Sequence, residues 1–178
     1  MKKNKHKPGL LWITGLSGSG KTTISKLIFK ELKKKYSNII LFDGDKLRNK
    51  ERIKSNSSFS NNSRKKIGFK YVNLCKKYVY EKEKYVIIAT VTLISKVQKE
   101  YKKIINCFDV FLDVPIKELK KRDPKNLYKK FENNEIRNMV GLDIKFDIPK
   151  KPSLHIKWKK DLTALKISKK IRKLIANE

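Results

Sequence analysis

The chain has 178 residues, 39% of them hydrophobic, which suffices for one α/β domain with a full core and excludes a disordered tail. Lys and Arg number 46 against 17 Asp and Glu, a formal net charge of +29. No apolar run reaches the roughly 18 residues of a membrane-spanning helix, so no membrane contact is expected. The apolar stretch from Leu10 to Ile13 is too short for a signal-peptide core, and we expect a cytoplasmic protein.

The positive charge invites a nucleic-acid hypothesis, but its distribution argues against one. The excess is lysine spread over the whole chain, together with abundant Ile and Asn, a mixture that AT-rich codons produce. We therefore expect a compositional charge and no nucleic-acid partner. Cys75 and Cys107 lie far apart in sequence and suit neither a disulfide scaffold nor a zinc site, so both are expected to be free, buried thiols.

The first half of the chain alternates strand and helix patterns. Leu10–Thr14 is a short apolar run that predicts a strand, and apolar residues at helical spacing predict a helix over 24–32. Ile39–Phe42 predicts a second strand. Lys46–Asn62 is rich in Lys, Asn and Ser, and predicts a mobile loop. Residues 67–78 again have helical spacing.

The second half continues the alternation and ends in an amphipathic helix. Alternating strands and helices predict a three-layer α/β fold with a mainly parallel sheet flanked by helices. We expect a single domain over residues 1–178. The remaining predicted elements are strands at Tyr85–Thr90, Phe108–Val114 and Ser153–Trp158, a short helix opened by Pro115, a polar lid over about 122–147 and a closing helix over about 161–176.

One segment between the first strand and the first helix fits the pattern G-x-x-x-x-G-K-[ST]. Its glycines let successive backbone N–H groups turn toward a phosphate, and the helix N-terminus adds a favourable dipole. Lysine at this position reaches the β- and γ-phosphates, and the following hydroxyl binds Mg²⁺. We expect ATP to be bound by Gly15, Leu16, Ser17, Gly18, Ser19, Gly20, Lys21, Thr22 and Thr23, with Thr22 holding Mg²⁺ through its hydroxyl and water.

Together with the alternating strands and helices, this motif predicts a three-layer P-loop NTPase fold. The loop lies near the start of a short chain, which is typical of a small-molecule kinase, so we expect a single P-loop kinase domain over residues 1–178. The sequence contains no N/T-K-x-D signature for guanine, which disfavours a GTPase. The second strand ends in Asp43-Gly44-Asp45, where strand ends of an open sheet face a ligand. Two interpretations stay open: catalytic carboxylates, or an Asp-Gly turn with helix caps. Arg48 and Arg64 are candidate anion-binding residues, or solvated surface.

The motifs in order resemble those of the adenylylsulfate kinase family, from about Leu11 to about Leu154. The phosphate loop is generic, whereas the later motifs are specific to that family. The matching segments are 12–23 (WITGLSGSGKTT), 42–45 (FDGD) with Arg48, 59–60 (FS) with Arg64, 113–115 (DVP), 122–130 (RDPKNLYKK) and 141–143 (GLD).

That resemblance implies transfer of the ATP γ-phosphate to the ribose 3′-hydroxyl of adenylylsulfate, with Mg²⁺ required. It implies that Lys21, Asp45 and Asp43 are catalytic, with Asp45 as the base, and that Arg122 lies near the ATP base. It also makes a homodimer an expectation. The acceptor contacts that it implies are Asp45, Arg48, Phe59, Arg64, Thr92, Lys125, Leu127 and Tyr128.

The acceptor side departs from the family pattern more than the ATP side does. Ser63 stands where the family usually has Asp, and Ile67 stands where an Asn contacts the acceptor. Phe69 and Lys70 replace an Arg pair, and Val91–Ile94 replaces Ile-Ser-Pro-Tyr. A different acceptor nucleotide is therefore a real alternative.

One branch of the family supplies that alternative. It carries an Ala-Thr-Ile-Ser-Leu-like string where this chain has Ala89–Leu93, and a member phosphorylates cytidine diphosphoramidate on its ribose for capsule biosynthesis. Three hypotheses follow: a nucleotide kinase with adenylylsulfate first and the cytidine compound second, a catalytically degenerate nucleotide-binding partner protein, and a nucleic-acid-binding protein.

Overall fold

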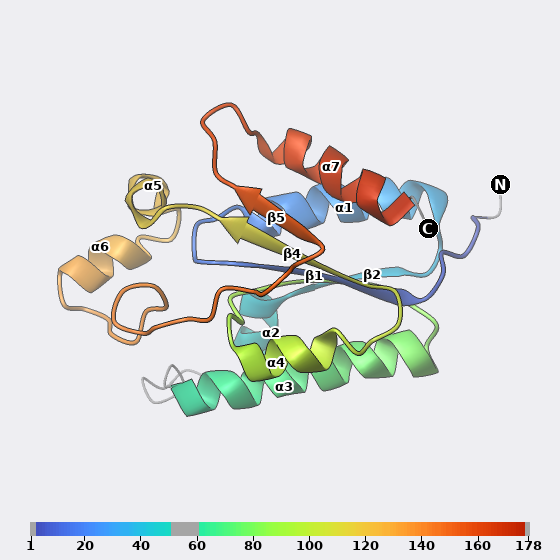
Figure 1. Ribbon diagram of the computed structural model, residues 1–178, viewed down its shortest axis with the longest axis horizontal. Helices are drawn as coiled ribbons and strands as arrows, with labels where there is room; N and C mark the ends of the chain where they lie inside the picture. Colours follow the sequence, from blue (N-terminus) through green and yellow to red (C-terminus); the bar gives the residue numbers. More distant parts are fainter. Residues whose placement is uncertain (1–2, 51–60, 177–178) are drawn as a thin grey trace.

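A computed structural model describes residues 3–50 and 61–176 (Figure 1). At its centre is one sheet of parallel strands in the order β2-β3-β1-β4-β5. Because every strand runs the same way, all carboxyl ends meet at one edge, where open α/β sheets bind ligands. The strands are β1 (Gly9–Gly15), β2 (Ile39–Asp43), β3 (Tyr85–Thr90), β4 (Cys107–Asp113) and β5 (Leu154–Lys157).

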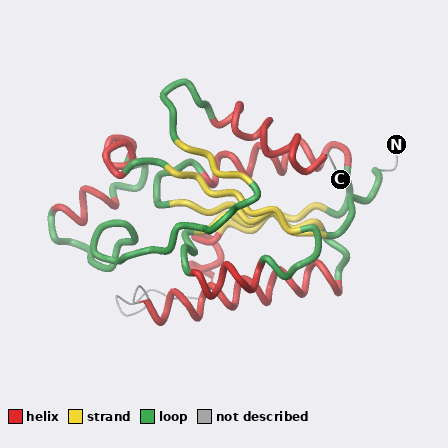
Figure 2. The backbone as a smooth tube through the Cα atoms, in the orientation of Figure 1, coloured by secondary structure: helices red, strands yellow, loops and turns green. Residues whose placement is uncertain are grey.

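Helices cover both faces of this sheet, as Figure 2 shows. On one face lie α1 (Lys21–Lys35) and α7 (Ala164–Ala176), which pack against each other. The other face carries α2 (Gly44–Lys50), α3 (Asn61–Lys76) with its π-helical continuation η2 (Lys77–Glu81), and α4 (Ser95–Tyr101). Two short helices, α5 (Ile116–Arg122) and α6 (Leu127–Glu132), lie beyond the carboxyl ends of the strands. The predicted three-layer fold is confirmed.

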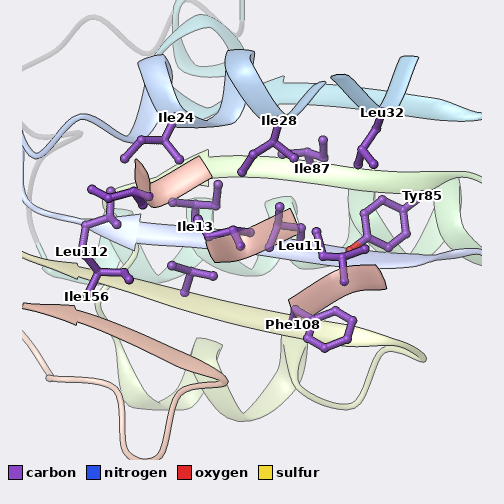
Figure 3. Close-up of a cluster of buried hydrophobic side chains, with 14 of the residues drawn as sticks. Leu11, Ile13, Ile24, Ile28, Leu32, Tyr85, Ile87, Phe108, Leu112 and Ile156 are labelled. Atoms are coloured by element: carbon purple, nitrogen blue, oxygen red, sulfur yellow. The ribbon is translucent and has the colours of Figure 1, made fainter. Parts of the chain in front are cut away.

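The central strands of the sheet are buried on both faces. All residues of β1 and of β3 are buried, as expected for strands covered on both faces. Figure 3 shows the cluster between the sheet and α1, in which Ile24 and Ile28 pack on Leu11 and Ile13. A second cluster fills the opposite face, and a third lies under the lid. The phosphate loop is therefore anchored between two well-packed elements.

The expected loop over Lys46–Asn62 is wrong at both ends. Helix α2 continues to Lys50, and α3 already begins at Asn61. The reason lies in Asp43, whose Oδ1 accepts hydrogen bonds from the N–H groups of Asp45 and Lys46 and thereby caps α2. The remainder of that prediction, like Phe59, lies outside the described residues. Helix α4 was not predicted, because seven residues give too little periodicity.

Within residues 3–50 and 61–176, no helix is both long enough and apolar enough to cross a membrane. Both thiols are free, Cys75 buried and Cys107 half-buried.

Candidate active site

The phosphate loop runs from the end of β1 to the start of α1. A side chain at Gly15 would stand 2.7 Å from the carbonyl oxygen of Leu112 on β4, so this position needs glycine. Gly20 caps α1 with a φ of 91°, in the left-handed region that glycine tolerates. These two glycines let the loop curl tightly against the sheet edge.

Lys21 is the buried cation of this loop. Its Nζ donates to the carbonyl oxygen of Leu16 at 2.7 Å and lies 3.4 Å from Ser19 Oγ. Burial lowers the pKa of Lys21 to about 8, partly offset by the charges of Asp45 and Asp43. The ammonium is therefore held in a poorly solvated site, where a phosphate oxygen would be a better partner than a carbonyl.

Thr22 and Asp43 bring a hydroxyl and a carboxylate together beside the loop. Thr22 Oγ1 donates to Asp43 Oδ2 at 2.8 Å. Both groups are oxygen donors of the kind that Mg²⁺ prefers. The described residues contain no group of three or more His, Cys, Asp or Glu side chains that would form an all-protein metal cage. The arrangement fits an ion held by one hydroxyl, water and substrate phosphates.

Asp45 lies on the first turn of α2, between two cations. Arg48 from the same helix and Lys125 from the lid each donate to one of its carboxylate oxygens. Burial alone would raise the pKa of Asp45, but the Lys125 hydrogen bond and the charges of Lys125, Arg48 and Lys21 outweigh it and lower the pKa. Asp45 is therefore ionised at neutral pH and able to accept a hydrogen bond from a hydroxyl.

A pocket opens beside Asp45 at the carboxyl end of β3. Arg64 from α3 contributes a cation, and its Nη2 donates to the carbonyl oxygen of Asn138 at 2.6 Å. Burial lowers the pKa of Arg64 to about 10, so it stays charged at neutral pH. The pocket is lined by Gly44, Asp45, Arg48, Arg64, Ile67, Tyr71, Thr90, Val91, Thr92, Leu93, Ile94, Val140, Ile144, Lys145 and Phe146.

Four of the expected acceptor residues thus share one pocket: Asp45, Arg48, Arg64 and Thr92. Lys125 reaches Asp45 from the lid. Tyr128 is 2% exposed, and its hydroxyl donates to the carbonyl oxygen of Ser17 in the phosphate loop. Leu127 packs in the cluster under the lid. These last two side chains connect the lid to the core and are not part of the pocket lining.

A second, smaller pocket adjoins the phosphate loop on its other side. It brings Ser19 together with Arg122 at the end of α5 and Trp158 after β5. Arg122 therefore stands beside the loop, consistent with its expected place near the ATP base. Trp158 was not singled out from the sequence, because an isolated aromatic residue after a strand gives no signal of its own.

The lid segment after α6, which was predicted from sequence only as a polar lid, forms one wall of the pocket beside Asp45. Asp147 fastens it to α4: its Oδ2 accepts from Ser95 N at 2.6 Å, its N–H donates to Leu93 O, and its carbonyl accepts from Gln98 Nε2. The hydrogen bonds from Ser95 lower the pKa of Asp147. One residue thus sets the separation between Leu93 on one pocket wall and Phe146 on the other.

Comparisons with known proteins agree with this geometry. A family model described as adenylylsulphate kinase matches residues 7–157. The chain is 36% identical over 146 residues to a cytidine diphosphoramidate kinase of Campylobacter jejuni, covering 82% of this chain and 84% of the relative. It is 35% identical over 160 residues to an adenylyl-sulfate kinase of Buchnera aphidicola, covering 86% and 73%.

Solved structures show the same likeness. The Mycobacterium tuberculosis APS kinase in complex with AMPPNP and APS matches with a TM-score of 0.78 and 25% identity, covering 99% of both chains. Shikimate kinase of Aquifex aeolicus shares the fold at a TM-score of 0.57 and 20% identity, covering 94% of this chain and 96% of that one. The phosphate loop, the carboxylates of Asp43 and Asp45, the lid and these matches agree. The chain belongs to the adenylylsulphate kinase family.

Proposed function

We propose that this protein transfers the γ-phosphate of ATP to a ribose hydroxyl of a nucleotide, as one kinase domain over residues 1–178. The observation that carries the proposal is the position of Asp45, which lies between the phosphate loop and the pocket at the carboxyl end of β3. Its carboxylate interacts with Lys21 on one side and contacts Arg48 and Lys125 on the other. A hydroxyl bound there would stand between an ionised carboxylate and the transferred phosphoryl group.

Phosphoryl transfer of this kind needs positioning and charge neutralisation more than covalent chemistry. The loop N–H groups and Lys21 bind the β- and γ-phosphates, and their charges offset the charge that spreads over the phosphoryl oxygens. Thr22 and Asp43 are the residues that would hold Mg²⁺, which supplies further neutralisation when bound. Asp43 also caps α2, so it fixes the direction from which Asp45 faces the pocket.

Asp45 orients the acceptor hydroxyl and accepts its proton as the new bond forms. Arg48 and Arg64 line the same pocket and supply positive charge for the anionic groups of the acceptor. The lid then limits the access of water, so that the phosphoryl group passes to the acceptor. Leu127 and Tyr128 pack in the hydrophobic cluster between the lid and the core, and their contact with the acceptor stays a prediction.

Two acceptors are proposed, and different observations favour each. Adenylylsulfate is the first, because the family model and the relatives from Buchnera and Mycobacterium carry that name. Cytidine diphosphoramidate is the second, favoured by the Campylobacter relative and by Ile67, an apolar side chain in the pocket wall. A site that presents Ile in place of a polar contact selects against the nucleotide that needs that contact.

A coupled ADP-release assay with Mg²⁺-ATP tests the function and identifies the acceptor. The panel holds adenylylsulfate, cytidine diphosphoramidate, CDP, AMP and a blank without acceptor. Turnover that depends on one nucleotide supports the proposal, and omission of Mg²⁺ should abolish it. Binding of ATP without turnover on every acceptor would instead favour the degenerate partner protein.

Asp45→Asn separates the catalytic role from folding. The amide keeps the size of the side chain but cannot accept the proton, so we expect turnover to fall by about 10²–10⁴-fold, the usual range for general base catalysis, with ATP affinity little changed. Asp161→Asn is the matched control, because that carboxylate is exposed and lies outside the pocket lining. Wild-type turnover by Asp45→Asn would exclude Asp45 as the base.

Three further expectations belong to the same proposal. A cytoplasmic location is supported by the two free thiols and by the use of ATP. A homodimer is supported by family resemblance, and light scattering after size exclusion measures it. A salt-independent affinity for ATP together with no retention on DNA would exclude the nucleic-acid hypothesis, since phosphate-backbone binding weakens steeply with salt.

A further inference from the structure

A third cavity, of about 400 Å³, lies at the end of the molecule opposite the phosphate loop. Helix α1 begins at the loop with Lys21, and the cavity is formed at its last turn, about 20 Å away at 1.5 Å per residue. The last turns of α1 and α7 and the N-terminal segment surround it. It is lined by His6, Glu31, Leu32, Lys35, Tyr36, Lys169, Arg172, Lys173, Ile175 and Ala176.

The cavity gathers positive charge that the described protein does not neutralise. Four of its side chains are cations and one, Glu31, is a carboxylate. Glu31 already pairs with Lys34 at 2.8 Å and lies 3.8 Å from Arg172. The side chains of Lys35, Lys169 and Lys173 form no ion pair or hydrogen bond within residues 3–50 and 61–176. These like charges line one cavity, and an anion bound there would offset them.

The interior of the cavity is apolar and is held in place. Leu32 and Ile175 are 8% and 4% exposed. His6 and Tyr36 pack edge to face with ring centroids 4.7 Å apart. The backbone of His6 is fixed on both sides by Asn38, which accepts its N–H and donates to its carbonyl oxygen, each at 2.8 Å. The wall is therefore formed before any ligand arrives.

We propose that this cavity is a second nucleotide site, distinct from the phosphate loop. The ligand chemistry follows from the lining: at least two negative charges for the unpaired lysines, and a flat body for the aromatic and aliphatic wall. A cavity of this volume lies within the range that holds drug-sized ligands. Lys169 and Lys173, one turn apart on the same face of α7, bind the phosphates, and the base lies against Leu32 and Tyr36.

Calorimetric titration with ADP tests the proposal. The wild type should bind two ADP molecules, and Lys21→Ala, which disables the phosphate loop, should still bind one. Adding Lys169→Glu and Lys173→Glu to Lys21→Ala should weaken that remaining affinity at least tenfold. The matched control adds Lys166→Glu and Lys170→Glu, which make the same change of charge on the same helix, also four residues apart, but lie outside the cavity lining.

Three results of these titrations would overturn the proposed second nucleotide site or its assignment. One site in the wild type and none in Lys21→Ala overturns the proposal, and so does an equal loss in the control variant, which would show general attraction by the charged surface. Pyrophosphate that binds as tightly as ADP overturns the assignment to a nucleotide, since the apolar wall would then contribute nothing. Thermal unfolding of each variant, together with kinase turnover of Lys169→Glu/Lys173→Glu in the wild-type background, confirms that the chain still folds.

Discussion

Replacement of Lys21 by methionine should stabilise the protein while removing its activity. The side chain keeps its length but loses the buried charge. Burial lowers the pKa of this lysine from 10.5 to about 8, which corresponds to a cost of about 3 kcal/mol in the free energy of folding at neutral pH. The variant also loses the hydrogen bond to the Leu16 carbonyl, which lowers its free energy of unfolding by about 1 kcal/mol. The net expectation is a stabilisation of about 2 kcal/mol.

The pH dependence of the stability difference shows whether the buried charge of Lys21 causes it. Below pH 8 the lysine is protonated in both the folded and the unfolded protein, so the cost is fully present. Between about pH 8 and 10.5 the folded form loses its proton first, and the cost disappears as pH rises. The stability difference between Lys21→Met and the wild type should therefore be largest at pH 7 and shrink above pH 8.

Urea unfolding at pH 7, 8.5 and 9.5 measures this difference. With a slope of about 1–3 kcal/mol per molar urea, a gain of about 2 kcal/mol moves the midpoint by about 1 M. Lys26→Met is the control, because Lys26 is exposed on the same helix and its replacement should change little. A Lys21→Met variant that is no more stable than the wild type, or a gain that does not vary with pH, would refute the reasoning. Loss of kinase turnover by orders of magnitude should accompany the gain.

Three further outcomes follow from other contacts. Asp147→Ala removes the acceptor of the Ser95 hydrogen bond, so KM for the acceptor nucleotide should rise several-fold while KM for ATP stays constant; steady-state kinetics with each substrate varied separates the two. Lys102→Met leaves the buried carboxylate of Asp109 without its ion-pair partner at 3.1 Å and should lower the free energy of unfolding by about 3 kcal/mol in urea titrations. Gly141→Ala strains a φ of 90° and should lower the melting temperature by several degrees, as calorimetry can show.

The phosphate loop and the positions of the buried strands could be predicted from sequence because each depends on local patterns. Four fixed residues within eight positions define the loop, and β1 and β3 are unbroken apolar runs. A fully buried strand shows itself in this way whatever surrounds it. The family motifs then identified Asp45 and Arg48 as neighbours of the loop, and both line the pocket beside it.

The shape of the pocket wall over residues 140–146 could not be predicted, because this segment forms no helix or strand and has no periodic pattern of apolar residues. Its shape depends on single polar contacts: the carboxylate of Asp143 accepts from the N–H of Asn138 at 2.7 Å, and Asp147 ties the segment to α4. Asn138 has a positive φ of 62°. The fold brings these residues together, and their spacing in the sequence does not. Local propensity and periodicity therefore do not predict such contacts.

The ion pair between Asp45 and Lys125 bears on whether bound ATP is hydrolysed by water. The lid lysine contacts the carboxylate that we propose as the base. A water molecule that enters the pocket beside bound ATP then meets a carboxylate whose negative charge is engaged on two sides, by Lys125 and by Arg48. Such a carboxylate is a poor proton acceptor. Under the proposed function, an acceptor nucleotide whose anionic groups compete for those cations would free the carboxylate, and hydrolysis of ATP would be suppressed until that nucleotide had bound.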